Sequence, residues 1–134
     1  MGIEGLGIEL RMLALSIVLG FVHIMLSAQA CTKQYGLRWN IGARDEPMPP
    51  LDPLGGRLQR ASHNFSETFP LFAAAVLLAL AAGKQGALTD WGTQLYFWAR
   101  VVYLPLYAFG IAVVRTIVWT VAMVGLFLNL AALL

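Results

Sequence analysis

The chain has 134 residues, of which 59% are hydrophobic and 12% charged, whereas a typical soluble domain has about 45–50% and about 25%. A soluble domain of this size would have too little polar surface to cover so many apolar side chains. The formal net charge of +2 is too small for a nucleic-acid-binding surface, and the single cysteine excludes a disulfide framework and a cysteine-based zinc site. This composition predicts an integral membrane protein.

The first apolar segment, 12–30, has no charged residue and is long enough to cross a hydrocarbon core about 30 Å thick. Ala28-Gln29-Ala30 before Cys31 resembles a signal-peptidase site, and a lipoprotein signal ending at Cys31 is the alternative. However, the region before the segment lacks a net positive charge, and the segment is longer than the apolar region of a usual signal peptide. We therefore expect a transmembrane helix over about residues 6–30.

The next segment, 32–56, is a long polar connection. It contains Pro47-Met48-Pro49-Pro50, followed by Pro53 and Gly55-Gly56. Proline removes a backbone donor and glycine is flexible, so we expect no regular helix here.

The rest of the chain contains three more apolar segments. We expect helices over about residues 57–83, 89–109 and 112–134. One unbroken helix over 101–134 would be about 51 Å long, which exceeds the bilayer, and Gly110 followed by Arg115 supplies a turn. The sequence thus predicts one domain, residues 1–134, with an all-α fold: a bundle of four transmembrane helices.

Basic residues are distributed unequally between the two ends of this bundle. One end has Arg11 and Lys84, and the other has Lys33, Arg38, Arg44, Arg57, Arg60 and Arg115. By the positive-inside rule, the 32–56 loop is cytosolic and both termini lie on the opposite side of the membrane.

Two polar stripes follow the helical repeat within apolar segments. Arg60, Asn64 and Glu67 are spaced i, i+4, i+7 and share one face, with Arg57 and His63 beside it. A second stripe consists of Tyr96, Arg100, Tyr103 and Tyr107. Charges at membrane depth are costly, so they need partners or a function.

Two interpretations of these stripes remain open. The side chains could satisfy one another, with Arg60 pairing with Glu67 through Asn64, and Arg100 pairing with Glu67 or a tyrosine hydroxyl. Alternatively, one carboxylate against several arginines favours a site for an anion, because arginine binds carboxylates with two hydrogen bonds. Glu67 could hold an ammonium group, so a zwitterionic molecule with several carboxylates would fit. An arginine or tyrosine near a thiol could also stabilise a thiolate.

Residues 60–72, RASHNFSETFPLF, resemble the helix-2 signature of the membrane-associated proteins in eicosanoid and glutathione metabolism, the MAPEG family. Residues 96–103, YFWARVVY, with Tyr107, are similar to the helix-3 pattern of that family. The resemblance covers the full length, is closest to bacterial-type members, and implies a homotrimer in the bacterial inner membrane. It also implies that glutathione is a co-substrate bound between subunits near the cytosolic face.

Carried over position by position, the resemblance implies glutathione contacts by Arg60, Asn64, Glu67 and Tyr103, and also by Arg100 and Tyr107. Arg57 flanks this set, and Arg38 could contribute from a neighbouring subunit. Arg115 is the candidate for the arginine that stabilises the glutathione thiolate. In these roles Arg60 and Arg38 take carboxylates, Glu67 the ammonium, and Asn64 a backbone amide.

The function that we expect is glutathione transfer to lipophilic electrophiles, or reduction of lipid hydroperoxides, with substrates that arrive from membrane lipid. A non-catalytic protein of the same fold that binds lipid or presents it to a partner is the alternative. We expect no metal site, because the two histidines are isolated, and no nucleic-acid partner. His23 is expected to be buried and hydrogen-bonded, and Trp119 to be an interface anchor facing lipid.

Overall fold

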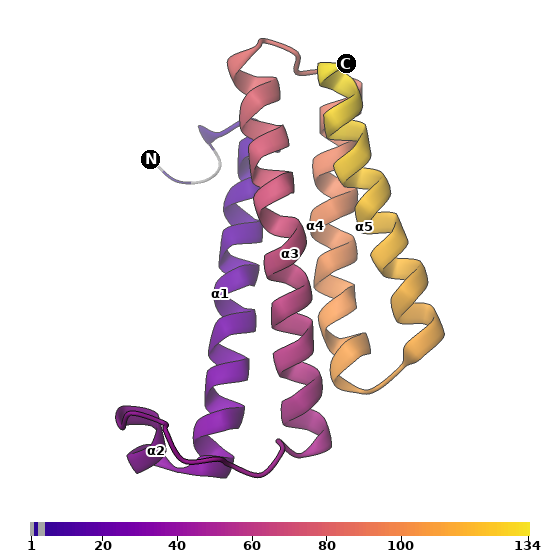
Figure 1. The fold of residues 1–134 in the computed structure, drawn as a ribbon. Helices are drawn as coiled ribbons and strands as arrows, with labels where there is room; N and C mark the ends of the chain where they lie inside the picture. The colour runs from indigo at the N-terminus through magenta and orange to yellow at the C-terminus, as the bar shows by residue number, and fades with distance from the viewer. Residues whose placement is uncertain (1, 3–4) are drawn as a thin grey trace.

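A computed structural model describes Gly2 and residues 5–134 of the chain, and this part consists of helices and their connections, without strands. The helices are α1 (Ile8–Tyr35), α2 (Leu37–Ile41), α3 (Pro53–Ala81), α4 (Ala87–Ala108) and α5 (Ala112–Leu133). The four long helices run side by side as a bundle, with α1 next to α3 and α4 next to α5 (Figure 1).

The long helices differ in how well they suit a membrane. Within the described residues, α1, α3 and α5 are long and apolar enough to span one, which supports the predicted class of integral membrane protein. The 22-residue helix α4 contains Asp90 and Arg100, and it is not among the helices that are long and apolar enough to span a membrane. That α4 is a fourth crossing therefore stays a prediction.

The 32–56 segment is more helical than expected. Helix α1 continues to Tyr35, the short α2 follows, and α3 already begins at Pro53 instead of near residue 57. Proline is favoured in the first turn of a helix, where its missing N–H would have no partner, and the Asp52 carboxylate accepts a hydrogen bond from the Gly55 N–H at 2.7 Å. The prediction of no regular helix holds only for residues 42–52.

The connection between α4 and α5 agrees with the sequence. Gly110 has φ of 75°, a left-handed conformation that favours glycine, and α5 begins two residues later. The chain therefore reverses between Ala108 and Ala112, so that α4 and α5 form an antiparallel pair.

The two ends of the bundle contain different connections between helices. The start of α1 and the C-terminus lie with the α3–α4 turn at one end, and the 36–52 loop lies at the other end with the α4–α5 turn (Figure 1). At the first end, the Thr89 hydroxyl donates a hydrogen bond of 2.9 Å to the buried carboxylate of Glu9, which joins α4 to α1. The membrane side on which each end lies stays a prediction.

Candidate functional site

A polar cavity of about 260 Å³ lies between α3, α4 and α5. It is lined by Asn64, Tyr103, Tyr107, Arg115, Thr116 and Trp119. Four of these six residues belong to the predicted site, although they come from three helices. We call this space the Arg115 cavity.

Arg115 is half-buried in the first turn of α5. Its guanidinium carbon lies 4.5 Å from the centre of the Tyr107 ring, so a cation–π contact fixes its position. The N-terminal end of a helix carries a partial positive charge, which adds to the charge of the guanidinium. The cavity therefore has a positive potential that would stabilise a thiolate or a carboxylate.

Arg100 lies behind the wall of this cavity and is completely buried. Its Nη1 donates a hydrogen bond of 2.7 Å to the Asn64 Oδ1, and its guanidinium carbon lies 4.2 Å from the centre of the Tyr103 ring. Its Nε and Nη2 have no hydrogen-bond partner within the described residues. Arg100 thus holds two cavity residues in place, and it pairs with an amide instead of the carboxylate of Glu67.

The hydrogen bond between Arg100 and Asn64 gives a test of this arrangement. Asn64→Leu should lower the free energy of unfolding by about 1–3 kcal/mol, because a buried charged group loses its partner. The double variant Asn64→Leu/Arg100→Met should cost less than the sum of the two single changes. Equilibrium unfolding in mixed detergent micelles would measure this, with the exposed Ser66→Ala on the same helix as control. Strict additivity would contradict the contact.

The remaining members of the two stripes have different environments. Tyr96 is buried, and its hydroxyl shares a hydrogen bond of 2.9 Å with the Thr68 hydroxyl, while its ring stacks on Phe72 at 3.9 Å. It is therefore part of the core. His23 is also buried and stacks on Phe65 at 4.9 Å, but neither ring nitrogen has a partner among the described residues, so the expected hydrogen bond is absent.

The other predicted binding residues do not line the Arg115 cavity. Arg57 donates from Nε to the Ala108 carbonyl at 2.8 Å and so fixes the end of α4. Arg60 and Glu67 are exposed on α3, and Arg38 is exposed on α2. Asn64, through which Arg60 could pair with Glu67, instead accepts a hydrogen bond from Arg100, and the pairing of Arg60 with Glu67 is not seen in the described part of the chain.

Two cavity residues, Thr116 and Trp119, are absent from the predicted site. Trp119 is half-buried and its Nε1 is shielded from solvent, so it is not the lipid-facing interface anchor that the sequence predicts. Helical spacing could have found it, because Trp119 follows Arg115 by four residues and so lies on the same face of α5. Thr116 is adjacent to Arg115 in sequence and gives no comparable signal.

Comparison with known proteins connects this geometry to a family. A family model, that of the MAPEG family, matches residues 12–134, which is nearly the whole chain. No curated protein sequence gives a significant match.

Proposed function

The chain belongs to the MAPEG family, and from this premise we propose that it is a membrane glutathione transferase or peroxidase. Its substrates would be lipophilic electrophiles or lipid hydroperoxides. Membership supports a membrane function in glutathione or eicosanoid chemistry in general, and the specific activity is our proposal. The observation that carries it is the Arg115 cavity, where a guanidinium fixed on Tyr107 lies beside Tyr103 and Asn64.

The proposed reaction needs a cation close to the glutathione sulfur, because that sulfur becomes negatively charged when the thiol loses its proton. Arg115 would stabilise the thiolate that remains when the glutathione thiol loses its proton. The thiolate would then attack an electrophilic carbon, forming a carbon–sulfur bond while the leaving group departs with its electron pair. The tyrosine hydroxyls of Tyr103 and Tyr107 would donate hydrogen bonds to the remaining polar atoms.

The homotrimer that the resemblance implies would give Arg60 and Glu67 a covered environment. Both side chains are exposed on a helix that is suited to span a membrane. A charge facing the bilayer centre costs about 2.5–3.5 kcal/mol on insertion scales, so such residues need a covered environment. We propose that a neighbouring copy covers this face and that glutathione binds between copies, with Arg60 on a carboxylate and Glu67 on its ammonium group.

Arg57 and Arg100 would have supporting roles in this site. Arg57 uses Nε for the Ala108 carbonyl, which leaves its two terminal nitrogens for a glutathione carboxylate. Arg100 would act through Asn64, because its own side chain is fully buried and lies outside the cavity lining. Asn64 would then present its amide to the peptide backbone of glutathione.

Glutathione binding tests the proposal directly. Calorimetry on the detergent-purified protein should show binding, and Glu67→Gln should raise the Kd about tenfold to hundredfold, because a hydrogen bond to a charged group is worth about 1.5–3 kcal/mol. Glu46→Gln in the exposed loop is the matched control and should leave the Kd unchanged. An equal Kd for Glu67→Gln would remove Glu67 from the site, and no binding by the wild type would overturn the proposed function.

A second candidate function is a non-catalytic lipid-binding scaffold of the same fold. An apolar cavity of about 290 Å³ lies between α1 and α3, and its lining includes Ile17, Phe21, Phe65 and Phe69. Such a surface suits an acyl chain and does not require glutathione. This alternative expects lipid binding without a thiolate signal, so ultraviolet difference absorbance on addition of glutathione distinguishes the two functions.

A further inference from the structure

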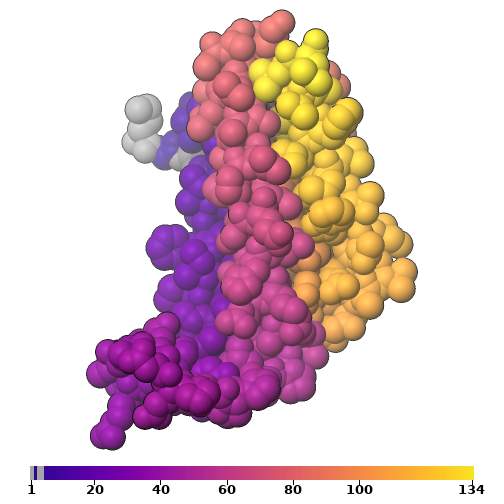
Figure 2. Space-filling view, in the orientation of Figure 1, coloured from indigo at the N-terminus to yellow at the C-terminus, as the bar shows by residue number. Residues whose placement is uncertain are grey.

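The short helix α2 lies outside the bundle and exposes large apolar side chains. Leu37 is 68% exposed and Ile41 is 77% exposed. They are four residues apart and therefore lie on the same face of the helix. Figure 2 shows the 36–52 loop, which contains α2, as a lobe that projects sideways from the ends of α1 and α3. This apolar face, Leu37 and Ile41, has no partner within the described chain.

The position of α2 is fixed by specific contacts. Gly36 turns the chain with φ of 98°, and the Asn40 Nδ2 donates a hydrogen bond of 2.6 Å to the Thr32 hydroxyl in α1. The Gln34 side chain binds the end of the loop before α3. It donates to the Pro50 carbonyl at 2.9 Å and accepts from the Asp52 N–H at 2.8 Å. The loop therefore holds α2 firmly, and the exposure of its apolar face is part of the fold.

The location of α2 along the chain places it at the membrane surface. Helix α1 is suited to span the bilayer, and its uncharged part ends before Lys33 in its last turn. Helix α2 begins two residues after α1 ends. The half-buried rings of Tyr35 and Trp39 lie 4.9 Å apart at this level, and such aromatic residues are enriched where headgroups meet the hydrocarbon.

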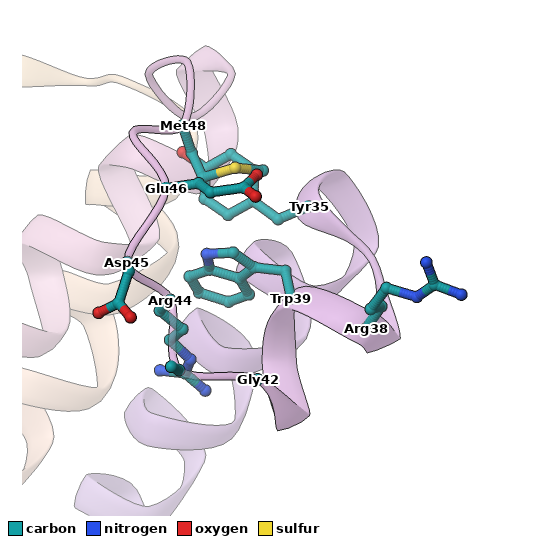
Figure 3. A pocket seen from close by; sticks show the side chains of 9 residues that line it. Tyr35, Arg38, Trp39, Gly42, Arg44, Asp45, Glu46 and Met48 are labelled. Carbon is teal, nitrogen blue, oxygen red and sulfur yellow. The ribbon is translucent and has the colours of Figure 1, made fainter.

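Cationic side chains surround α2, and one of them, Arg38, lies apart from the carboxylates of the loop. Lys33, Arg38 and Arg44 are exposed cations, and the Arg44 guanidinium carbon lies 4.3 Å from the centre of the Trp39 ring. Arg38 belongs to the lining of the pocket formed by the loop, and Figure 3 shows its guanidinium pointing outward, on the far side of Trp39 from Asp45. Arg38 is thus free of these carboxylates and lies next to the apolar face.

We propose that α2 is an interfacial helix that binds the surface of an anionic phospholipid bilayer. Leu37 and Ile41 enter the boundary between headgroups and acyl chains, and Arg38 binds a lipid phosphate. Apolar side chains and cations on one short helix are the combination that interfacial segments use, and anionic headgroups add attraction for each cation near the surface. This inference depends only on insertion of α1 into a membrane and is independent of glutathione chemistry.

Spin-label accessibility tests the proposal on the full chain. Cys31→Ser provides a cysteine-free background, in which Leu37→Cys, Ile41→Cys and the loop control Glu46→Cys are labelled one at a time. Each protein is reconstituted into vesicles of phosphatidylcholine alone, or of phosphatidylcholine with an equal amount of phosphatidylglycerol. Collision rates with oxygen, which concentrates in lipid, and with a water-soluble nickel complex are then compared. Circular dichroism and gel filtration confirm that each variant is folded.

We expect labels at 37 and 41 to collide more with oxygen than with nickel, and the label at 46 to show the reverse. The depth at 37 and 41 should increase in the anionic vesicles, and Arg38→Gln should abolish that increase. Strong nickel collisions at 37 and 41 would overturn the proposal. Protection from both reagents would also overturn it, because a second copy of the chain would then cover α2. Equal depth in the two vesicles would overturn the role of anionic headgroups.

Discussion

Arg115→Ala should lower kcat for glutathione transfer by about 100- to 1000-fold, the usual loss when one donor to a developing negative charge is removed. The guanidinium of Arg115 is the cation of its cavity, and stacking on Tyr107 fixes it there. Without it, the thiol proton would be lost less readily. Glutathione should still bind, because Arg60, Asn64 and Glu67 would remain.

Ultraviolet difference absorbance separates the two steps of that prediction. Wild-type protein should show a thiolate signal on addition of glutathione, and Arg115→Ala should bind glutathione by calorimetry without that signal. Arg115→Lys is the matched control, because it keeps a cation but loses the planar group that stacks on the ring of Tyr107. It should recover part of the thiolate signal. Unchanged turnover in Arg115→Ala would remove Arg115 from the mechanism.

The sequence was informative about which residues share a face of one helix. Tyr107 follows Tyr103 by four residues, and both line the Arg115 cavity. Arg100 continues the same stripe and is directed into the bundle. These placements follow from the 3.6-residue repeat, which depends on the helix alone.

The same repeat could not show which neighbour each face meets. Arg60, Asn64 and Glu67 form one stripe on α3, yet Asn64 is directed towards Arg100 while the other two are exposed. A small rotation of α3 about its axis decides this division, and that rotation depends on packing against α1, α4 and α5. The spacing within α3 contains no information about it.

The 32–56 segment shows a different limit of the sequence analysis. Proline breaks a helix in its interior, but Pro53 is the first residue of α3, where its missing N–H is harmless. Helix α2 was missed because five residues are too few to show a periodic pattern. Its stability comes from tertiary contacts such as the hydrogen bond between Asn40 and Thr32, and these cannot be deduced from local sequence.

Helices α4 and α5 approach each other closely at Gly92 of α4 and Gly125 of α5. A Cβ atom at Gly125 would lie 2.6 Å from the Gly92 carbonyl oxygen and 2.6 Å from the Tyr96 backbone nitrogen. A Cβ atom at Gly92 would lie 2.7 Å from the Gly125 carbonyl oxygen. Small residues let membrane helices pack this closely. The nearest atoms to a Cβ at Gly125 belong to the backbone of α4, so no side-chain rotation can relieve that clash.

Gly125→Ala should therefore destabilise the bundle at the upper end of the usual cost of overpacking, about 1–3 kcal/mol. The added methyl group must push α4 and α5 apart, and this separation should also widen the Arg115 cavity and weaken glutathione binding. Equilibrium unfolding in mixed detergent micelles would measure the loss. Val124→Leu is the control, because it enlarges the neighbouring side chain on the exposed face of α5. Equal unfolding free energies for the two variants would show that α4 and α5 do not pack this closely.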